Sequence, residues 1–277
     1  MDAQLLPTTY LVGDRFETFA RKDRVETVNR FVGNVRSGLF DRLVDPMRLV
    51  AGQGVDASDW DTVRTELSRR GLLDRFVLPA RLPAAVPAAD VHKQQEENVL
   101  LADVAASGPL ALTARLRLSD RNELVTDHVT GQHLSGMVLI EAGRQMILAG
   151  THEFVLTPDT EPDFSFVLGS LSVAFERYVF PIGAELALRL TKLPSSKPAR
   201  LEFTAEVEVT QSGEVAARIS AEFQVVRTRG LARQEEMLAT KAIEACGFTA
   251  EQPVGAPARQ CSSAPARRAA ARVPQGA

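Results

Sequence analysis

The stretch that decides the fold lies at residues 127–145 and reads DHVTGQHLSGMVLIEAGRQ. It begins as a polar loop with two histidines, His128 and His133, and continues as an apolar segment with helical spacing. A helix this apolar must be buried. The few polar side chains that it carries therefore need a partner or a task, because a polar group buried without either is costly.

Three of these polar side chains, Glu141, Arg144 and Gln145, stand at positions i, i+3 and i+4 and share one helix face. Two interpretations are open. In one, the side chains satisfy each other and only fix the packing. In the other, they face a cavity where Glu141 acts on a ligand, and the free helix amides at residues 136–138 hold a carbonyl oxygen or an oxyanion.

The two loop histidines suit proton transfer, because histidine titrates near neutral pH. A metal site would have to use His128 and His133 together with Asp127 and Glu141. The spacing of these residues does not match a standard ligand pattern. We therefore expect neither a metal nor another cofactor.

A second polar cluster contains His92 and Lys93, followed by Glu96, Glu97 and Asn98. It is either a solvated entry to a strand or a cationic site for a phosphate or for the acidic surface of a carrier protein.

The composition of the whole chain is that of an ordinary globular protein: 277 residues, 45% hydrophobic, 24% charged, with a formal net charge of −3. This charge gives no electrostatic case for nucleic acid or for an anionic membrane. The first residues lack the pattern of an export signal, no apolar run reaches membrane-spanning length, and only two cysteines are present. We expect a cytoplasmic protein that binds neither nucleic acid nor membrane.

Residues 1–80 alternate between short apolar runs and helical spacing, which predicts a small α/β or mostly helical segment. Its expected strands lie at 9–12, 47–51 and 76–78, and its expected helices at 23–43 and 58–71, the second capped by Ser58. Residues 81–90 carry two prolines without periodicity and read as a linker.

Residues 91–230 predict an α+β domain in which one long central helix is wrapped by a curled antiparallel sheet. Two strands precede the helix and four follow it, and Ser212, Gly213 and Glu214 form a hairpin turn between the last two. The expected strands lie at 99–104, 110–118, 164–180, 184–193, 200–210 and 215–226. Residues 231–248 predict a terminal helix, and residues 249–277 a disordered tail.

Two motifs give the chain a resemblance to the A-factor biosynthesis (AfsA-type) hotdog family. One is VHK at residues 91–93 with NVLL at 98–101. The other is DH at 127–128, then His133, then GMVLIEAGRQ at 136–145. The resemblance covers about half of the chain. It implies a hotdog fold, a homodimer, and chemistry on acyl thioesters of acyl carrier protein or coenzyme A.

The resemblance also implies an activity, the transfer of a β-ketoacyl group to the hydroxyl of a dihydroxyacetone-phosphate-type acceptor. This step belongs to the biosynthesis of γ-butyrolactone or butenolide signals or of related secondary metabolites. Glu141 would act with His128 or His133 to deprotonate the hydroxyl. The expected substrate-binding residues are His92, Lys93, Gly136, Met137, Arg144 and Gln145.

The sequence departs from the family pattern at three positions within the motif. Gln132 stands in place of an Asp, Ser135 in place of a Pro, and Gly143 in place of an Ala. Members also carry two repeats, and this chain shows one. Two other functions therefore stay open: a hotdog thioesterase or β-hydroxyacyl dehydratase, and a non-catalytic acyl-binding or partner-docking protein.

Overall fold

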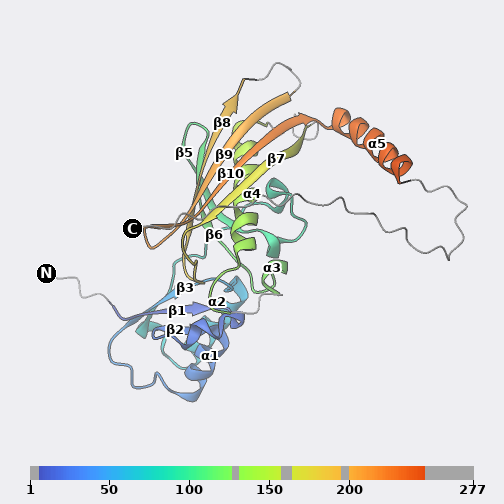
Figure 1. Cartoon of the computed structure of the whole chain (residues 1–277). Helices are drawn as coiled ribbons and strands as arrows, with labels where there is room; N and C mark the ends of the chain where they lie inside the picture. Colours follow the sequence, from blue (N-terminus) through green and yellow to red (C-terminus); the bar gives the residue numbers. More distant parts are fainter. Residues whose placement is uncertain (1–5, 127–130, 157–163, 195–199, 247–277) are drawn as a thin grey trace, which may run out of the picture. The chain divides into compact units, whose positions relative to one another are not determined.

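The computed structural model describes residues 6–126, 131–156, 164–194 and 200–246 (Figure 1). The chain divides into two compact units, Met1–Leu231 and Ala232–Ala277. Both β-sheets belong to the first unit. Within the described residues, no helix combines the length and apolarity that crossing a bilayer requires.

The larger sheet is antiparallel and has the strand order β5-β6-β8-β9-β10-β7. The predicted hairpin turn between β9 and β10 is confirmed, with Ser212 and Gly213 both at positive φ. The strands are β5 (Leu101–Gly108), β6 (Ala111–Leu116), β7 (Phe164–Phe175), β8 (Glu185–Leu193), β9 (Arg200–Gln211) and β10 (Glu214–Arg227).

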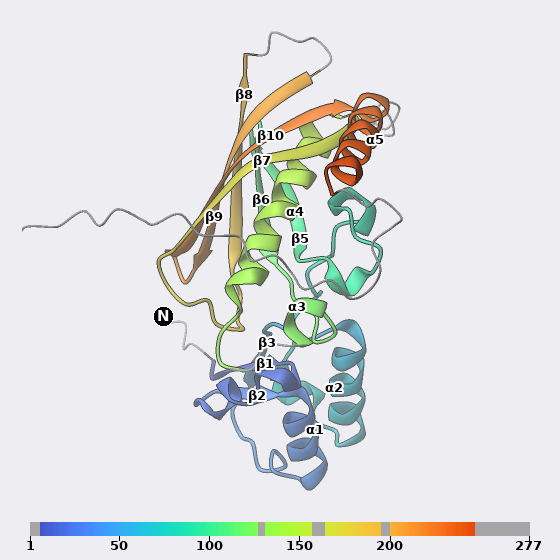
Figure 2. The same ribbon diagram turned by 45° about the vertical axis from the view of Figure 1, so that its right-hand side comes forward.

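The long helix α4 (Gly136–Phe154) lies along one face of this sheet (Figure 2). Two glycines on α4 allow the close approach. A Cβ atom at Gly143 would come within 2.5 Å of Ile219 Cδ1 on β10, and one at Gly150 would overlap Leu188 on β8. The sheet side of the core alternates as predicted, and on β9 it presents Phe203, Ala205, Val207 and Val209. This arrangement is the hotdog fold that the sequence predicts.

The N-terminal segment forms a parallel sheet of order β2-β1-β3-β4 with its own core. Helices α1 and α2 contribute Phe31, Trp60 and Leu67 to that core, against Leu11 and Leu49 of the sheet. The elements are β1 (Thr8–Val12), β2 (Val25–Thr27), α1 (Val28–Ser37), β3 (Met47–Ala51), α2 (Ala57–Arg69) and β4 (Phe76–Val77).

Two details differ from the sequence prediction. Strand β2 lies inside the stretch predicted as helix, and α1 begins only after Thr27, whose hydroxyl accepts a hydrogen bond from the Arg30 amide. Asp56, not Ser58, caps α2, and it forms a reciprocal capping box with Asp59.

The parallel sheet is bonded to the hotdog sheet through the loop after β3. The Gln53 amide donates to Pro181 O at 3.0 Å, its side chain donates to Leu116 O at 3.0 Å, and the Gly54 amide donates to Leu118 O at 2.8 Å. The stretch predicted as a linker runs beside β5, where Val86 N donates to Leu101 O at 3.2 Å. The domain boundary at 81–90 remains a prediction.

The second unit contains most of helix α5 (Thr228–Ala245), where a terminal helix was predicted from residue 231. Its described apolar side chains Met237, Leu238 and Ile243 are exposed. The tail predicted as disordered, 249–277, lies outside the described residues.

Candidate functional site

The site begins where the loop at 131–135 enters α4. Ser135 is the N-cap, and its hydroxyl accepts a hydrogen bond from the Met137 amide at 3.2 Å. The hydroxyl therefore occupies one of the helix amides, at residues 136–138, that the sequence predicts for an oxyanion. Gly136 leaves room for the ring of Phe175, which a Cβ atom there would meet at 2.9 Å.

One turn further along, the Glu141 carboxylate is surrounded by donors. Lys93 Nζ lies 2.8 Å from Oε1, and Arg144 reaches both oxygens, with Nε 2.8 Å from Oε2 and Nη2 2.8 Å from Oε1. Gln145 Nε2 donates to Oε1 at 3.1 Å. The predicted polar face thus exists, and Lys93 of the second polar cluster contacts it.

These contacts decide the charge of Glu141. Burial disfavours the ionised form, but the hydrogen bonds from Arg144, Lys93 and Gln145 outweigh it and lower the pKa of Glu141 to about 2. Glu141 is therefore an anion at neutral pH and a weak proton acceptor. Its negative charge holds two cations beside each other.

Gln145 anchors this cluster to the start of the sheet. It is fully buried, its Oε1 accepts from the Leu100 amide at 2.8 Å, and its Nε2 donates to Asn98 O at 2.9 Å. The predicted substrate-binding role of Gln145 is untested. These bonds give it a structural task, that of fixing α4 against the chain that enters β5.

A cavity of about 150 Å³ opens beside the cluster. Its lining is partly polar, with Lys93 and Glu141, and partly apolar, with Leu124, Met137 and Ile140. Asn98, Asn122 and Glu123 complete the lining. The sequence prediction missed Asn122 and Leu124. Asn122 directly precedes the four-residue helix α3 (Glu123–Thr126), which contains Leu124, and so short an element gives no sequence pattern that marks a pocket.

The predicted histidines lie elsewhere or outside the described residues. His92 packs its ring against Phe166, with centroids 5.2 Å apart, and against His152 at 5.8 Å, so it does not join Lys93 at the cavity. His133 lies against the ring of Tyr178, with a centroid distance of 4.8 Å. His128 lies outside the described residues.

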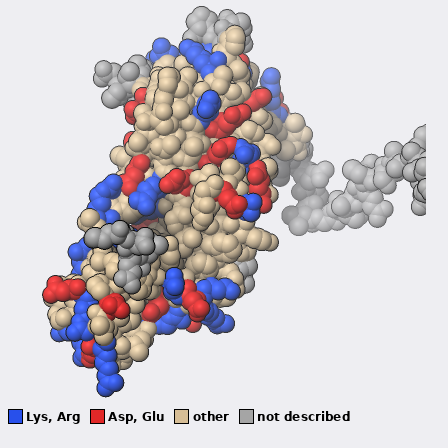
Figure 3. Space-filling model, turned by 90° about the vertical axis from the view of Figure 1, so that its left-hand side faces the viewer, with Lys and Arg blue, Asp and Glu red and all other residues tan. Residues whose placement is uncertain are grey.

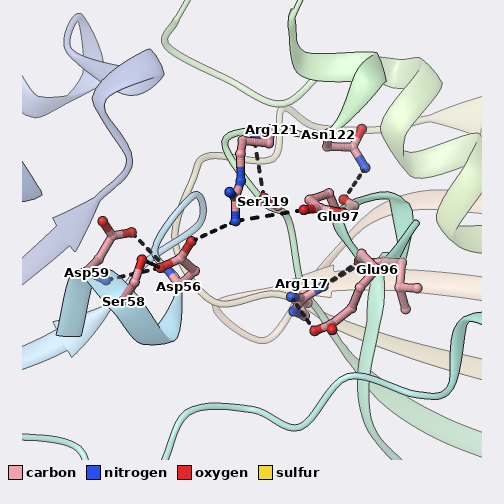
Figure 4. Close-up of polar contacts among 10 residues, drawn as sticks. Asp56, Ser58, Asp59, Glu96, Glu97, Arg117, Ser119, Arg121 and Asn122 are labelled. Atoms are coloured by element: carbon pink, nitrogen blue, oxygen red, sulfur yellow. Dashed lines mark hydrogen bonds and ion pairs between the residues drawn. The ribbon is translucent and has the colours of Figure 1, made fainter. Parts of the chain in front are cut away.

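A larger cavity of about 500 Å³ lies between the two sheets. Figure 4 shows part of its polar lining, where Arg121 reaches Asp56 at 3.4 Å and Glu97 at 3.8 Å. Arg117 holds Glu96 at 3.3 Å. On the face drawn in Figure 3, positive and negative side chains are interspersed, as in this cavity.

Known structures resemble about half of the chain at low sequence identity. A conserved protein from Pseudomonas aeruginosa is 19% identical, with 53% of this chain and 100% of that chain covered and a TM-score of 0.36. A mutant thioesterase from the same organism is 13% identical, with 46% and 81% covered and a TM-score of 0.34. A mutant thioesterase from Staphylococcus aureus is 6% identical, with 45% and 92% covered and a TM-score of 0.34.

No curated protein sequence matches the chain significantly. The family comparison does give a match, to the A-factor biosynthesis hotdog domain over residues 77–227. This match spans more than half of the chain, and it contains the whole antiparallel sheet, α4, and the Lys93–Glu141–Arg144 cluster. The protein is therefore a member of the AfsA family of A-factor biosynthesis hotdog proteins.

Proposed function

We propose that the protein is an acyltransferase that moves a β-ketoacyl group from a carrier thioester to the hydroxyl of a dihydroxyacetone-phosphate-type acceptor. The observation that carries this proposal is the pairing of Lys93 and Arg144 around Glu141, where Lys93 and Glu141 line the cavity and Arg144 contacts Glu141. Two cations held side by side suit a phosphorylated acceptor. Acyl carrier protein or coenzyme A is the proposed donor of the acyl group.

In the proposed reaction the acceptor hydroxyl gives its proton to a base, its oxygen attacks the thioester carbonyl carbon, and the carbon–sulfur bond breaks. The thiol then leaves with a proton. With a pKa of about 2, Glu141 is a poor base for this step. We assign Glu141 the task of positioning Lys93 and Arg144. We assign proton transfer to His128 of the preceding loop in place of His133, which packs against Tyr178 and does not line the cavity.

A second candidate is hydrolysis of the thioester by water. The cavity of about 150 Å³ favours it, because pockets for drug-sized ligands usually measure about 300–1,000 Å³. A water molecule needs less space beside the thioester in this cavity than a phosphorylated acceptor does. A β-hydroxyacyl dehydratase would use the same walls.

The Ser135 contact favours a third candidate, a protein that binds acyl thioesters without turnover. Its hydroxyl already occupies the Met137 amide, which leaves one donor fewer for an oxyanion.

We also propose that two copies pair through β7, the edge strand beside β10. The side of β7 that faces α4 carries Leu168, Leu171 and Phe175, which are 52%, 39% and 54% exposed. Apolar side chains on an open strand edge favour pairing with another strand.

The test is to incubate the purified protein with a β-ketoacyl carrier thioester and dihydroxyacetone phosphate, and to follow both by mass spectrometry. The acyl ester is the expected product. Free acid without ester supports the thioesterase, and an intact thioester bound tightly supports the binding protein.

Variants sharpen this assay. Lys93→Ala and Glu141→Gln should each reduce ester formation at least tenfold, because each disrupts the paired cations. Glu153→Gln is the matched control, since Glu153 is an exposed residue at the far end of the same helix. Unchanged rates in Lys93→Ala and Glu141→Gln would remove the site from the proposal.

A further inference from the structure

The N-terminal sheet has a crevice where the chain order reverses, between the carboxyl ends of β1 and β3. Open parallel sheets commonly bind their ligands at such a point. Here the crevice is bordered by Gly13, which follows β1, and by Gly54, in the loop after β3. A cavity of about 250 Å³ lies at its mouth.

A side chain of the hotdog domain fills this crevice. Asp120 follows β6, and a Cβ atom on either Gly13 or Gly54 would overlap its carboxyl group. Arg15 fixes the Asp120 backbone, with Nε 2.6 Å from Asp120 O, and the Arg15 amide lies 3.5 Å from Oδ2. Oδ1 is buried, and among the described residues it has no hydrogen-bond donor.

We propose that this crevice is a carboxyl-binding site whose ligand is the Asp120 side chain, so that the N-terminal sheet recognises and docks the hotdog domain of its own chain. The two glycines give the site its shape, and the turn after β1 gives it its donors. The role of the N-terminal segment is then to hold Asp120 in place, just before Asn122, which lines the cavity of the candidate site.

The charged groups around this carboxyl-binding site make the docking sensitive to pH. Asp14 and Arg15 face Asp120 from the turn after β1, and Asp56 and Asp59 from the start of α2. The neighbouring Arg121 contacts Asp56 and Glu97. Burial, aided by the charge of Asp14, raises the pKa of Asp120 from 3.8 to about 6, although backbone amides of Arg15 and Asp14 oppose the rise.

The sign of the pH effect follows from this. Because the folded-state pKa lies above the unfolded one, the contribution of Asp120 is fully present below pH 3.8 and is lost as the pH rises through 6. The crevice therefore binds the neutral carboxyl group of Asp120 better than the ionised one.

A double-mutant cycle tests the proposal. Gly13 has an extended backbone that alanine tolerates, so the cost of Gly13→Ala comes from the clash with Asp120. We expect Gly13→Ala to lower the Tm by about 4 °C or more in the wild-type background and by much less in Asp120→Ala. Equal losses in both backgrounds would overturn the proposal.

Gly33→Ala is the matched control, because a Cβ atom there meets nothing within 4 Å. Its effect should be the same with and without Asp120. If Gly13→Ala alone does not fold, folding of the double variant supports the proposal, and failure of the double variant to fold contradicts it.

The pH dependence gives a second measurement. Between pH 5 and pH 7.5 the Tm of the wild type should fall relative to that of Asp120→Asn by a few degrees. A constant difference in Tm between the two proteins would show that Asp120 does not titrate in this pH range, and would count against the proposal.

Discussion

At the scale of single residues, the site depends on polar groups that satisfy each other. Glu141 balances Lys93 and Arg144, while Gln145 connects that cluster to the backbone of residues 98 and 100. The two interpretations of the polar helix face are therefore not exclusive. Gln145 fixes the packing, while Glu141 lines the cavity.

Gln145→Leu should destabilise the fold by about 2–4 kcal/mol, because it leaves the buried Leu100 amide and the Asn98 carbonyl without partners. Urea unfolding followed by circular dichroism measures the change. Gln132→Leu is the control, since Gln132 is exposed, and it should stay within about 0.5 kcal/mol of the wild type. A small effect of Gln145→Leu would mean that water replaces its bonds.

Glu141 should make the fold sensitive to acid. Its folded-state pKa of about 2 lies below the ordinary 4.5, so its contribution is present above pH 4.5 and is lost as the pH falls toward 2. Thermal unfolding of the wild type and of Glu141→Gln at pH 7, 4.5 and 3 should show the two melting temperatures converging with acid. A gap that stays constant or widens would contradict the ion-pair cluster.

At the scale of elements, the glycines of α4 set its distance from the sheet. Gly143→Ala gains helix propensity worth up to about 1 kcal/mol, but its methyl group meets Ile219 at 2.5 Å. Because overpacking costs about 1–3 kcal/mol, we expect a net loss of stability, measured by chemical unfolding.

Two controls separate these effects. Gly33→Ala on α1 gains the same propensity without a clash and should stabilise the protein slightly. Adding Ile219→Val to Gly143→Ala removes the Cδ1 atom and should recover part of the loss. If Gly143→Ala is instead as stable as Gly33→Ala, the helix moves away from the sheet at little cost.

The sequence was most informative where a pattern is long. Nineteen residues of α4 and the alternation along β9 predict the central helix and its sheet, because periodicity repeats many times within each element. Strand β2 was missed since three residues, Val25 to Thr27, are too few to distinguish from a helix start. Capping by Asp56 instead of Ser58 differs by two positions, which is the usual uncertainty of a helix end.

The site was predictable only in part for a different reason. Glu141, Arg144 and Lys93 stand in motifs, and the structure brings them together. Asn122 and Asp120 act through neighbours far away in the sequence, such as Glu97 and Gly13, and nothing in their local sequence marks these contacts.

At the scale of the whole molecule, the proposed β7 pairing gives the hotdog sheet a second copy across its open edge. In β7, Phe175, Leu171 and Leu168 stand opposite Ala217, Ala221 and Phe223 of β10, which are buried. The apolar inner face of the sheet thus continues to its edge and is exposed there. A twofold axis beside β7 would cover the same residues in both copies.

The wild type should therefore sediment at about twice its chain mass of 30.1 kDa. Leu171→Lys places a charge on the covered face and should yield a monomer at micromolar concentration, because an unpaired charge is costly to bury. Val44→Lys is the matched control, since Val44 is 90% exposed and belongs to the N-terminal segment, and it should stay dimeric. A Leu171→Lys variant that still dimerises would show that the two copies do not pair through β7. A wild type that is monomeric up to about 100 µM would contradict the pairing as well. The exposed face of β7 would then mark a site for a different partner, because a stable monomer rarely exposes an apolar patch without such a role.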